Sequence, residues 1–394
     1  MGFFWDRNFN INGSSENVNF GWDILLSGDG TRLAISDPDY DSNDSNNTGY
    51  VAVYDLSKNL LTNEITSELN VEFIGDGAED NLGFSIDFSD DGNFIAIGSP
   101  GNDQNVGEVN IYERESDEWN LKGSTINGGS NNQSFGRSLS ISEDGSTIAI
   151  GDPLFDLSGI NEGSTTTFKY DSISQDWIQI GQNITGATSH SNLGYSVDLS
   201  LNGNLLGIGS PEKELSNKNG LVSLYQLQDQ AWQKIGQDIL GETNSDEAGT
   251  TLKVSSPDGT LDGSIIAVGA IKNDGEGKKN SGHVRVFKYS QSNNSWTKLG
   301  NDIDGTDIGD LSSYEIDLSE DGKTVSIGSI NHDSSGNDAG QVRIFNFDEG
   351  NNLWRQAGFD LLGTKANENF GSATSFSSDA KTIAISSLNG GENN

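Results

Sequence analysis

The chain has 394 residues, of which 59 are Asp or Glu and 22 are Lys or Arg, giving a formal net charge of −37. A surface this acidic repels nucleic acid and anionic membranes, and no apolar run approaches the ~18 residues of a membrane span, so neither is expected as a partner. The chain contains no cysteine, which excludes disulfides, thiolate metal sites and cysteine nucleophiles.

A short hairpin pattern recurs along the whole chain. In its clearest copy, residues 135–153, Leu139 and Ile141 alternate with small polar residues, the Asp144–Gly145 pair forms a tight turn, and an apolar return strand ends at Pro153. The hairpins begin near Phe20, Leu82, Phe135, Leu193, Ala248, Ser312 and Phe370. Their turns recur every 53 to 63 residues, a period typical of propellers and repeat arrays.

Each period contains four strand patterns. The hairpin supplies the first two, and the second reads IAIG or a close variant, with a small residue between β-branched ones. The third begins at a glycine and alternates, as in GYVAVY from Gly49, and the fourth carries an aromatic nine residues before a glycine, as in Trp177 and Gly186. The repeats predict one all-β domain over residues 1–394, a seven-bladed β-propeller of four-stranded antiparallel blades.

The two ends of the chain share the seventh blade. The sequence begins with a fourth-strand pattern, from Phe4 to Gly13, and finishes with a second-strand pattern at Ile383–Ile385. We therefore expect the N- and C-terminal strands to close this blade, which lacks one strand. Because an unpaired edge can accept a strand, the sequence predicts an edge contact with another chain there.

Several of these motifs also occur in a known family. They are the pairs Phe20-Gly21, Phe135-Gly136 and Phe370-Gly371, the strand ends Gly98-Ser99-Pro100, Gly151-Asp152-Pro153 and Gly209-Ser210-Pro211, and the GxVxVY strands. The pattern resembles the FG-GAP repeats of integrin-α-type propellers. The resemblance implies a non-enzymatic, surface-exposed binding or adhesion propeller that recognises a protein or a cell-surface glycan through an acidic loop face. The calcium loop of integrins is not matched, because the first turn here is short.

The loops after the second and fourth strands share one face, which is rich in carboxylates. The densest loop suggests calcium, since hard cations prefer oxygen ligands, and its candidate ligands are Asp37, Asp39, Asp41 and Asp44. Candidate ligand-binding residues are Trp5, Trp22, Asp152 and Asp156. The two tryptophans fall outside the repeated pattern, whereas a tryptophan at the same place in successive repeats is expected to pack between blades.

Enzymatic chemistry is not the favoured interpretation, because the three histidines lie in different repeats and no catalytic motif is present. Two alternatives to a binding module stay open. One is a structural protein of a virion or surface assembly. The other is a glycan hydrolase or lyase, with carboxylates facing the channel from Asp87, Asp198, Glu315 and Asp317. No signal peptide is visible at the start, and an extracellular, cell-surface or virion location is expected.

Overall fold

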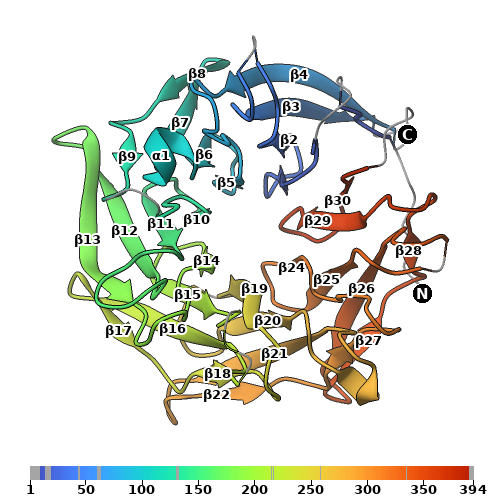
Figure 1. Cartoon of the computed structure of the whole chain (residues 1–394). Coiled ribbons are helices and arrows are strands. Elements are labelled where there is room, and N and C mark those ends of the chain that lie inside the picture. Colours follow the sequence, from blue (N-terminus) through green and yellow to red (C-terminus); the bar gives the residue numbers. More distant parts are fainter. Residues whose placement is uncertain are drawn as a thin grey trace.

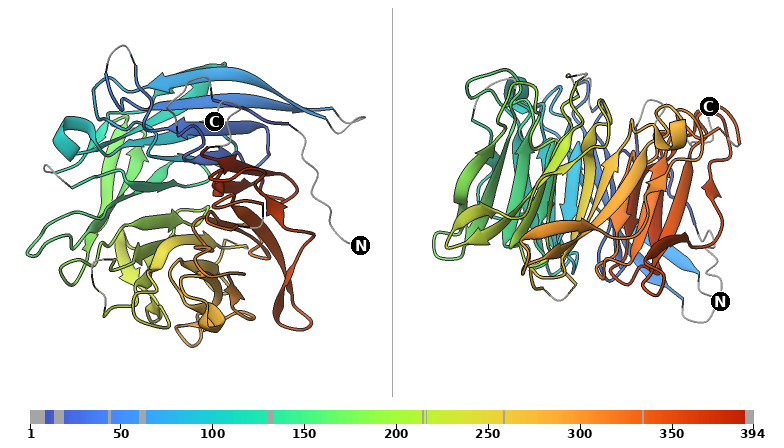
Figure 2. Two further views of the ribbon diagram at one scale, coloured as in Figure 1. Left: turned by 45° about the vertical axis from the view of Figure 1, so that its right-hand side comes forward. Right: turned by 90° about the horizontal axis from the view of Figure 1, so that it is seen from below.

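The chain forms a ring of seven antiparallel sheets around a central axis (Figure 1). The computed structural model describes residues 9–13, 19–42, 45–59, 64–129, 133–213, 215, 217–257, 259–333 and 335–389. Six sheets have at least four strands and the seventh has two, so the all-β propeller prediction is confirmed. Viewed from the side, the strands of neighbouring blades stand next to one another along the ring (Figure 2).

The blades are numbered in chain order and share one plan, from the inner strand outward. The inner strands are β1 (Ile24–Leu26), β5 (Ser85–Phe88), β10 (Ser138–Ile141), β14 (Ser196–Leu199), β19 (Ala248–Ser255), β24 (Ile316–Leu318) and β29 (Phe370–Phe376). The second strands are β2 (Arg32–Asp37), β6 (Phe94–Ser99), β11 (Thr147–Asp152), β15 (Leu205–Ser210), β20 (Ile265–Ala270), β25 (Thr324–Ser329) and β30 (Ile383–Ser387).

The outer half of each of the first six blades has two main strands. The third strands are β3 (Tyr50–Lys58), β7 (Glu108–Glu115), β12 (Ser164–Asp171), β16 (Leu221–Gln228), β21 (His283–Ser290) and β26 (Gln341–Asp348). The fourth strands are β4 (Ile65–Ile74), β8 (Glu118–Leu121), β13 (Asp176–Thr185), β17 (Ala231–Lys234), β22 (Ser295–Lys298) and β27 (Leu353–Gln356). Short segments that also pair with third strands are β9 (Ile126–Asn127), β18 (Ile239–Leu240), β23 (Ile303–Asp304) and β28 (Leu361–Leu362). Two loops after second strands hold α1 (Asn102–Asn105) and the 3-10 turn η1 (Gly275–Gly277).

The core lies between adjacent blades and is built mainly from the second strands. Ile95, Ala96 and Ile97 of β6 are fully buried, and Ala96 packs in one cluster with Leu139 and Ile148 of the third blade. Its small side chain lets the next sheet approach closely. Burying each large aliphatic side chain contributes roughly 1.5–3 kcal/mol, so these strands hold the ring together.

The repeated tryptophans join neighbouring blades. Trp177, Trp232, Trp296 and Trp354 are buried. Three of their indole N–H groups reach the preceding blade: Trp177 donates to the Lys122 carbonyl, Trp232 to the Thr167 hydroxyl and Trp354 to the Leu299 carbonyl. This agrees with the packing role expected for these residues.

The FG-like glycine is required by the same close packing. Gly136 has a φ of 85°, a conformation that L side chains rarely adopt, and its carbonyl oxygen lies 2.3 Å from where a Cβ on Gly98 of the second blade would sit. Gly151 and Gly194 repeat this contact at the next junction. The glycines of the FG and IAIG motifs therefore allow adjacent blades to pack closely. Any propeller with this blade geometry would need such small residues there.

The seventh blade is smaller than the others. Within the described residues β30 pairs only with β29, and Ile383, Ala384 and Ile385 are only partly buried, whereas their counterparts in the second blade are fully buried. The expected N-terminal strand starts at Phe4, outside the described residues, and residues 9–13 form no strand. Ile11 nevertheless packs against the core between the first and seventh blades.

Candidate functional site

The central channel is lined by the inner strands, and equivalent positions on them differ strongly in chemistry. We count from the first residue of each FG-like pair. Positions four and six carry a group of charged side chains that we call the channel cluster: Asp23, Asp87, Asp198, Lys253, Glu315 and Asp317. All six side chains interact electrostatically with at least two others of the group, so the ring brings residues from five blades to one place.

Most sixth-position side chains also bond the next blade. An oxygen at this position accepts the N–H of the seventh-position residue on the following inner strand, which we call a junction hydrogen bond. The pairs are Asp87 with Ile141 at 2.7 Å, Ser140 with Leu199 at 3.0 Å, Asp198 with Val254 at 2.6 Å, Asp317 with Phe376 at 2.6 Å and Ser375 with Leu26 at 2.9 Å. The last bond closes the ring between the seventh and first blades.

Lys253 and Leu25 interrupt this series, because neither side chain carries an oxygen. Lys253 instead points its ammonium at the carboxylates, with Nζ 3.7 Å from Oδ1 of Asp198. At the junction that Lys253 leaves open, the N–H of Leu318 is bonded by Oδ1 of Asp317 on its own strand, at 2.8 Å. At Lys253 the sixth position therefore makes no junction hydrogen bond, and it places a cation in the channel instead.

Burial shifts the acidity of this cluster toward neutral pH. It raises the pKa of Glu315 to about 8, helped by the nearby charges of Asp23 and Asp317 and opposed by Lys253. Burial likewise raises the pKa of Asp23 and Asp198 to about 7, against backbone N–H groups and Lys253. Burial disfavours the charge on Lys253, but the carboxylates outweigh it and raise its pKa. Near pH 7 the channel therefore holds a fixed ammonium, a protonated acid and ionisable bases.

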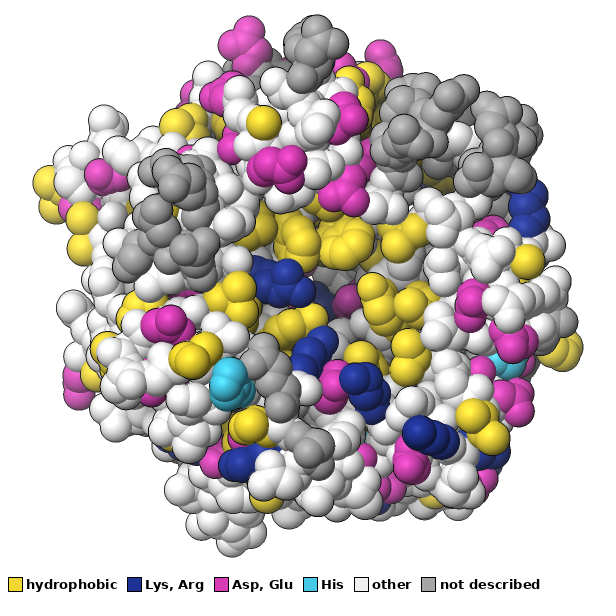
Figure 3. Space-filling model, in the orientation of Figure 1, with side chains coloured by type: hydrophobic (Ala, Val, Ile, Leu, Met, Phe, Trp, Pro, Cys, Tyr) yellow, Lys and Arg dark blue, Asp and Glu magenta, His cyan; other side chains and the backbone are white. Residues whose placement is uncertain are grey.

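The mouth of the channel is formed by third-position residues. Figure 3 shows a hollow at the centre of this face, with hydrophobic and basic side chains on its walls. Trp22, one of the predicted ligand-binding residues, lies with its ring 5.2 Å from that of Phe84, and its indole N–H donates to the Phe84 carbonyl at 3.0 Å. The predicted Trp5 lies outside the described residues.

The other predicted ligand residues lie on the loop face around this mouth. Asp152 is buried at the end of β11, and burial together with the charge of Asp156 raises its pKa to about 8. Asp156 is exposed, and one of its oxygens accepts the N–H of Asn161 at 2.6 Å. The two carboxyl groups interact, but neither belongs to the channel cluster.

The predicted calcium loop is organised by amides. Asn19 donates its backbone N–H to Asp37 at 3.1 Å and its side-chain N–H to Asp39 at 2.5 Å, and Asp41 accepts the N–H of Asn47. Asp44 lies outside the described residues. Calcium at this loop stays a prediction.

A different group, Asp307, Asp310 and His332, has the spacing of metal ligands. Asp310 already accepts the N–H groups of Thr306 and Asp307. The contact of His332 with Asp310 also has an equivalent in the preceding repeat, where Asn273 donates to Asp246. We interpret the group as a loop-shaping interaction.

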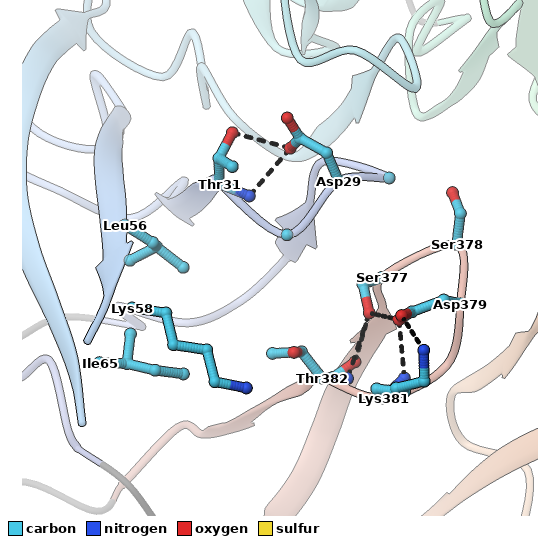
Figure 4. Close-up of a pocket in the computed structure, with 12 residues that line it drawn as sticks. Asp29, Thr31, Leu56, Lys58, Ile65, Ser377, Ser378, Asp379, Lys381 and Thr382 are labelled. Carbon is cyan, nitrogen blue, oxygen red and sulfur yellow. Dashed lines mark hydrogen bonds and ion pairs between the residues drawn. The ribbon is translucent and has the colours of Figure 1, made fainter. Parts of the chain in front are cut away.

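A cleft of about 420 Å³ opens on the other face, between the β1–β2 and β29–β30 turns (Figure 4). Its acidic side chains are engaged locally: Asp29 accepts two bonds from Thr31, and Asp379 binds Ser377 and Lys381. The cleft therefore offers engaged carboxylates, beside Lys58, and does not gather several carboxyl groups around a cation as the channel does.

Sequence reasoning anticipated four of the six channel residues but missed Asp23 and Lys253. The signal for Lys253 was present, because it is the only basic residue at the sixth position of seven aligned copies. Arg137 and Tyr195 at the mouth carried a weaker signal, since the third position varies freely among the repeats.

The fold and the channel define the class as a β-propeller with a charged central channel. No protein-family model and no curated protein sequence matches the chain. Among solved structures, it is similar to a putative 6-phosphogluconolactonase from Bacteroides uniformis ATCC 8492, with 15% sequence identity, a TM-score of 0.56, and coverage of 87% of this chain and 85% of that chain. No described helix has the length and apolar character needed to cross a membrane.

These findings correct three predictions. The FG-GAP assignment is wrong, since no family model supports it and the motif reflects the inter-blade glycine contact described above. The interpretation as a non-enzymatic binding or adhesion module and the preference against an enzyme are both contradicted by the comparison, because the propeller found by structural similarity is described as a putative 6-phosphogluconolactonase. The acid–base groups converge in the channel and not on the acidic loop face.

Proposed function

We propose that this protein is a hydrolase that opens a cyclic ester of a sugar acid within the central channel. One observation carries the proposal: the ammonium of Lys253 lies among carboxyl groups whose pKa values are shifted toward neutrality. The overall similarity to a lactonase propeller supports it at the level of fold. Fold alone does not specify chemistry, so the argument depends on the charges.

The ammonium within the cluster favours an ester over a glycoside. Attack of water on an ester carbonyl builds negative charge on the oxygen, which a fixed ammonium stabilises. Cleavage of a glycosidic bond passes through an oxocarbenium-like state, which a nearby cation destabilises. Lys253 is 3.7 Å from Asp198, so the cation is held in place by the same carboxylates that could serve as bases.

The channel residues can be assigned roles in this reaction. The oxygen of Asp198 that is not bonded to Val254 accepts a proton from water, whose oxygen attacks the lactone carbonyl. Lys253 stabilises the resulting oxyanion. As the ring C–O bond breaks, Glu315, protonated below its pKa of about 8, donates a proton to the leaving ring oxygen. The product is the open hydroxy acid, and transfer of the proton from Asp198 to Glu315 through solvent restores both groups.

The test is acid release from a panel of five- and six-membered sugar lactones, corrected for spontaneous hydrolysis. We expect Glu315→Gln to lower kcat about 100-fold, a typical effect of losing a general acid, and the wild-type rate to fall above about pH 8. Glu118→Gln, on the exposed strand β8, is the matched control. If the wild type accelerates no lactone, or if Glu315→Gln matches it, the proposal fails.

We also propose that the N-terminal segment and the open edge of β30 complete the seventh blade, with the edge left available to another chain. The support is that β30 has no second partner strand among the described residues. A peptide copying Gly340–Phe347 of the sixth blade is expected to raise the melting temperature, and its scrambled version is not. Equal melting curves with both peptides would contradict an accessible edge.

A further inference from the structure

Arg137 stands out in a chain where acidic residues outnumber basic ones by 59 to 22. Among the described residues, no carboxylate oxygen comes within ion-pair distance of its guanidinium, although most basic side chains of this part of the chain have one. It occupies the third position of the third blade, at the channel mouth. An arginine without a carboxylate in so acidic a protein is available to an anion from outside.

The guanidinium contacts two aromatic rings. Its Cζ lies 4.7 Å from the ring centre of Phe84 and 5.0 Å from that of Tyr195, and Nη2 donates to the Tyr195 hydroxyl at 3.2 Å. Arg137 is only partly buried. These contacts and the bond to Tyr195 restrict the guanidinium before binding, and the fork geometry of a guanidinium matches a carboxylate or phosphate.

A second cation lies on the same tyrosine. Nζ of Lys213 is 2.7 Å from the Tyr195 hydroxyl and 3.9 Å above its ring. Its ion-pair partner among the described residues, Glu247, is 4.0 Å away and is already bonded to Lys272 at 2.5 Å. Burial opposes ionisation of Tyr195, yet Lys213 and Arg137 lower its pKa, so the net field at this point is positive.

The adjoining part of the mouth is aromatic. Trp22 and Phe84 form a tilted pair, with ring centres 5.2 Å apart and 54° between the ring planes, and Phe84 also contacts Arg137, so an apolar surface adjoins the cation. Sugar rings present C–H faces to such surfaces while their charged substituents need a cation. The two chemistries meet within one group of third-position residues.

We infer that the channel mouth recognises the anionic group of a sugar, a carboxylate or a phosphate, through Arg137 and Lys213, with the sugar ring against Trp22 and Phe84. The inference deepens the proposed hydrolase and rests on it, since the held ring would extend toward Lys253. It names the substrate class as anionic rather than neutral sugar derivatives.

Binding measured by isothermal titration calorimetry tests this without turnover. The probes are glucuronate, glucose 6-phosphate and neutral glucose at low salt, and the first two identify which anion is preferred. We expect at least one anionic sugar to bind more tightly than glucose, with an affinity that falls as salt rises. Arg137→Gln should weaken that binding about 10-fold or more, whereas Arg355→Gln, an exposed arginine paired with Asp348, should leave it unchanged.

Arg137→Lys separates charge from geometry and is expected to recover only part of the affinity. The inference is overturned if glucose binds as tightly as both anions, or if folded Arg137→Gln binds them like the wild type. Anion binding without lactone hydrolysis would remove the proposed function but keep this recognition site. Hydrolysis with undiminished binding by Arg137→Gln would remove only the recognition site.

Discussion

Two junctions of the ring, side by side, use the same inner-strand position in different ways. Between the fourth and fifth blades, Asp198 accepts the N–H of Val254 at 2.6 Å. Between the fifth and sixth blades, Lys253 occupies that position and bonds no backbone group of the next strand, where Asp317 compensates for the N–H of Leu318. The first junction gains a hydrogen bond between neighbouring inner strands. The second lacks that bond and instead carries the ammonium of Lys253 in the channel.

This difference shows how to read a repeat protein. A residue that recurs at one position serves the repeat, so the acidic and hydroxyl side chains of the sixth position are first of all structural. A residue that breaks the series without improving packing is a better candidate for function. Active sites commonly carry such local losses of stability.

The largest expected effect is on lactone hydrolysis. It is expected when the junction between the fifth and sixth blades is given the same hydrogen bond as the junction between the fourth and fifth. In Lys253→Ser, the hydroxyl can accept the N–H of Leu318, as Ser140 accepts that of Leu199. We expect lactone hydrolysis to fall at least about 100-fold, as on removal of an oxyanion-stabilising group, while the free energy of unfolding changes by less than about 1 kcal/mol. Steady-state rates and urea unfolding measure both quantities.

The control for that variant is Lys298→Ser, on β22, where the lysine is paired with Asp302 near the surface. Unchanged hydrolysis by Lys253→Ser would show that the cation is structural. A large loss of stability would show that the pairing of Lys253 with the carboxylates stabilises the fold more than the new junction hydrogen bond does.

A smaller effect is expected at the neighbouring junction. Asp198→Ala leaves the N–H of Val254 without its acceptor and should lower the free energy of unfolding by about 2 kcal/mol. Asp198→Asn keeps an acceptor oxygen and should cost less than about 1 kcal/mol. Urea unfolding at pH 6 compares them, and equal losses in the two variants would contradict the role assigned to the junction hydrogen bond.

The smallest effect tests whether ring closure resembles an interior junction. Ser375→Ala removes the acceptor for Leu26, the bond that joins the seventh blade to the first. We expect a loss of about 1 kcal/mol, somewhat less than in Ser140→Ala, because both junction bonds are buried but the Ser140 hydroxyl also bonds the Asp87 carboxyl. Thermal unfolding with exposed Ser174→Ala as a reference checks this. A negligible loss in Ser375→Ala alone would mean that other contacts close the ring.

Much of the fold was predictable because its determinants are local. Alternation, Asp–Gly turns and the IAIG pattern identify each hairpin, and the period of repetition gives the propeller. The packing of the repeated tryptophans also followed from their regular place. The FG-GAP assignment failed because Gly136 is needed by the blade geometry and carries no information about ancestry or activity.

The sequence by itself determined the strands, their order and the acidic character of the surface, since each depends on neighbours along the chain or on composition. Only the tertiary structure decided the site. Asp23, Asp198, Lys253 and Glu315 belong to four blades, and their acidities depend on shared burial that no spacing encodes. Closure of the ring decides whether a carboxylate bonds a neighbouring strand or faces the channel. The reason is that closure determines which backbone N–H groups lie close enough to that carboxylate to bond it.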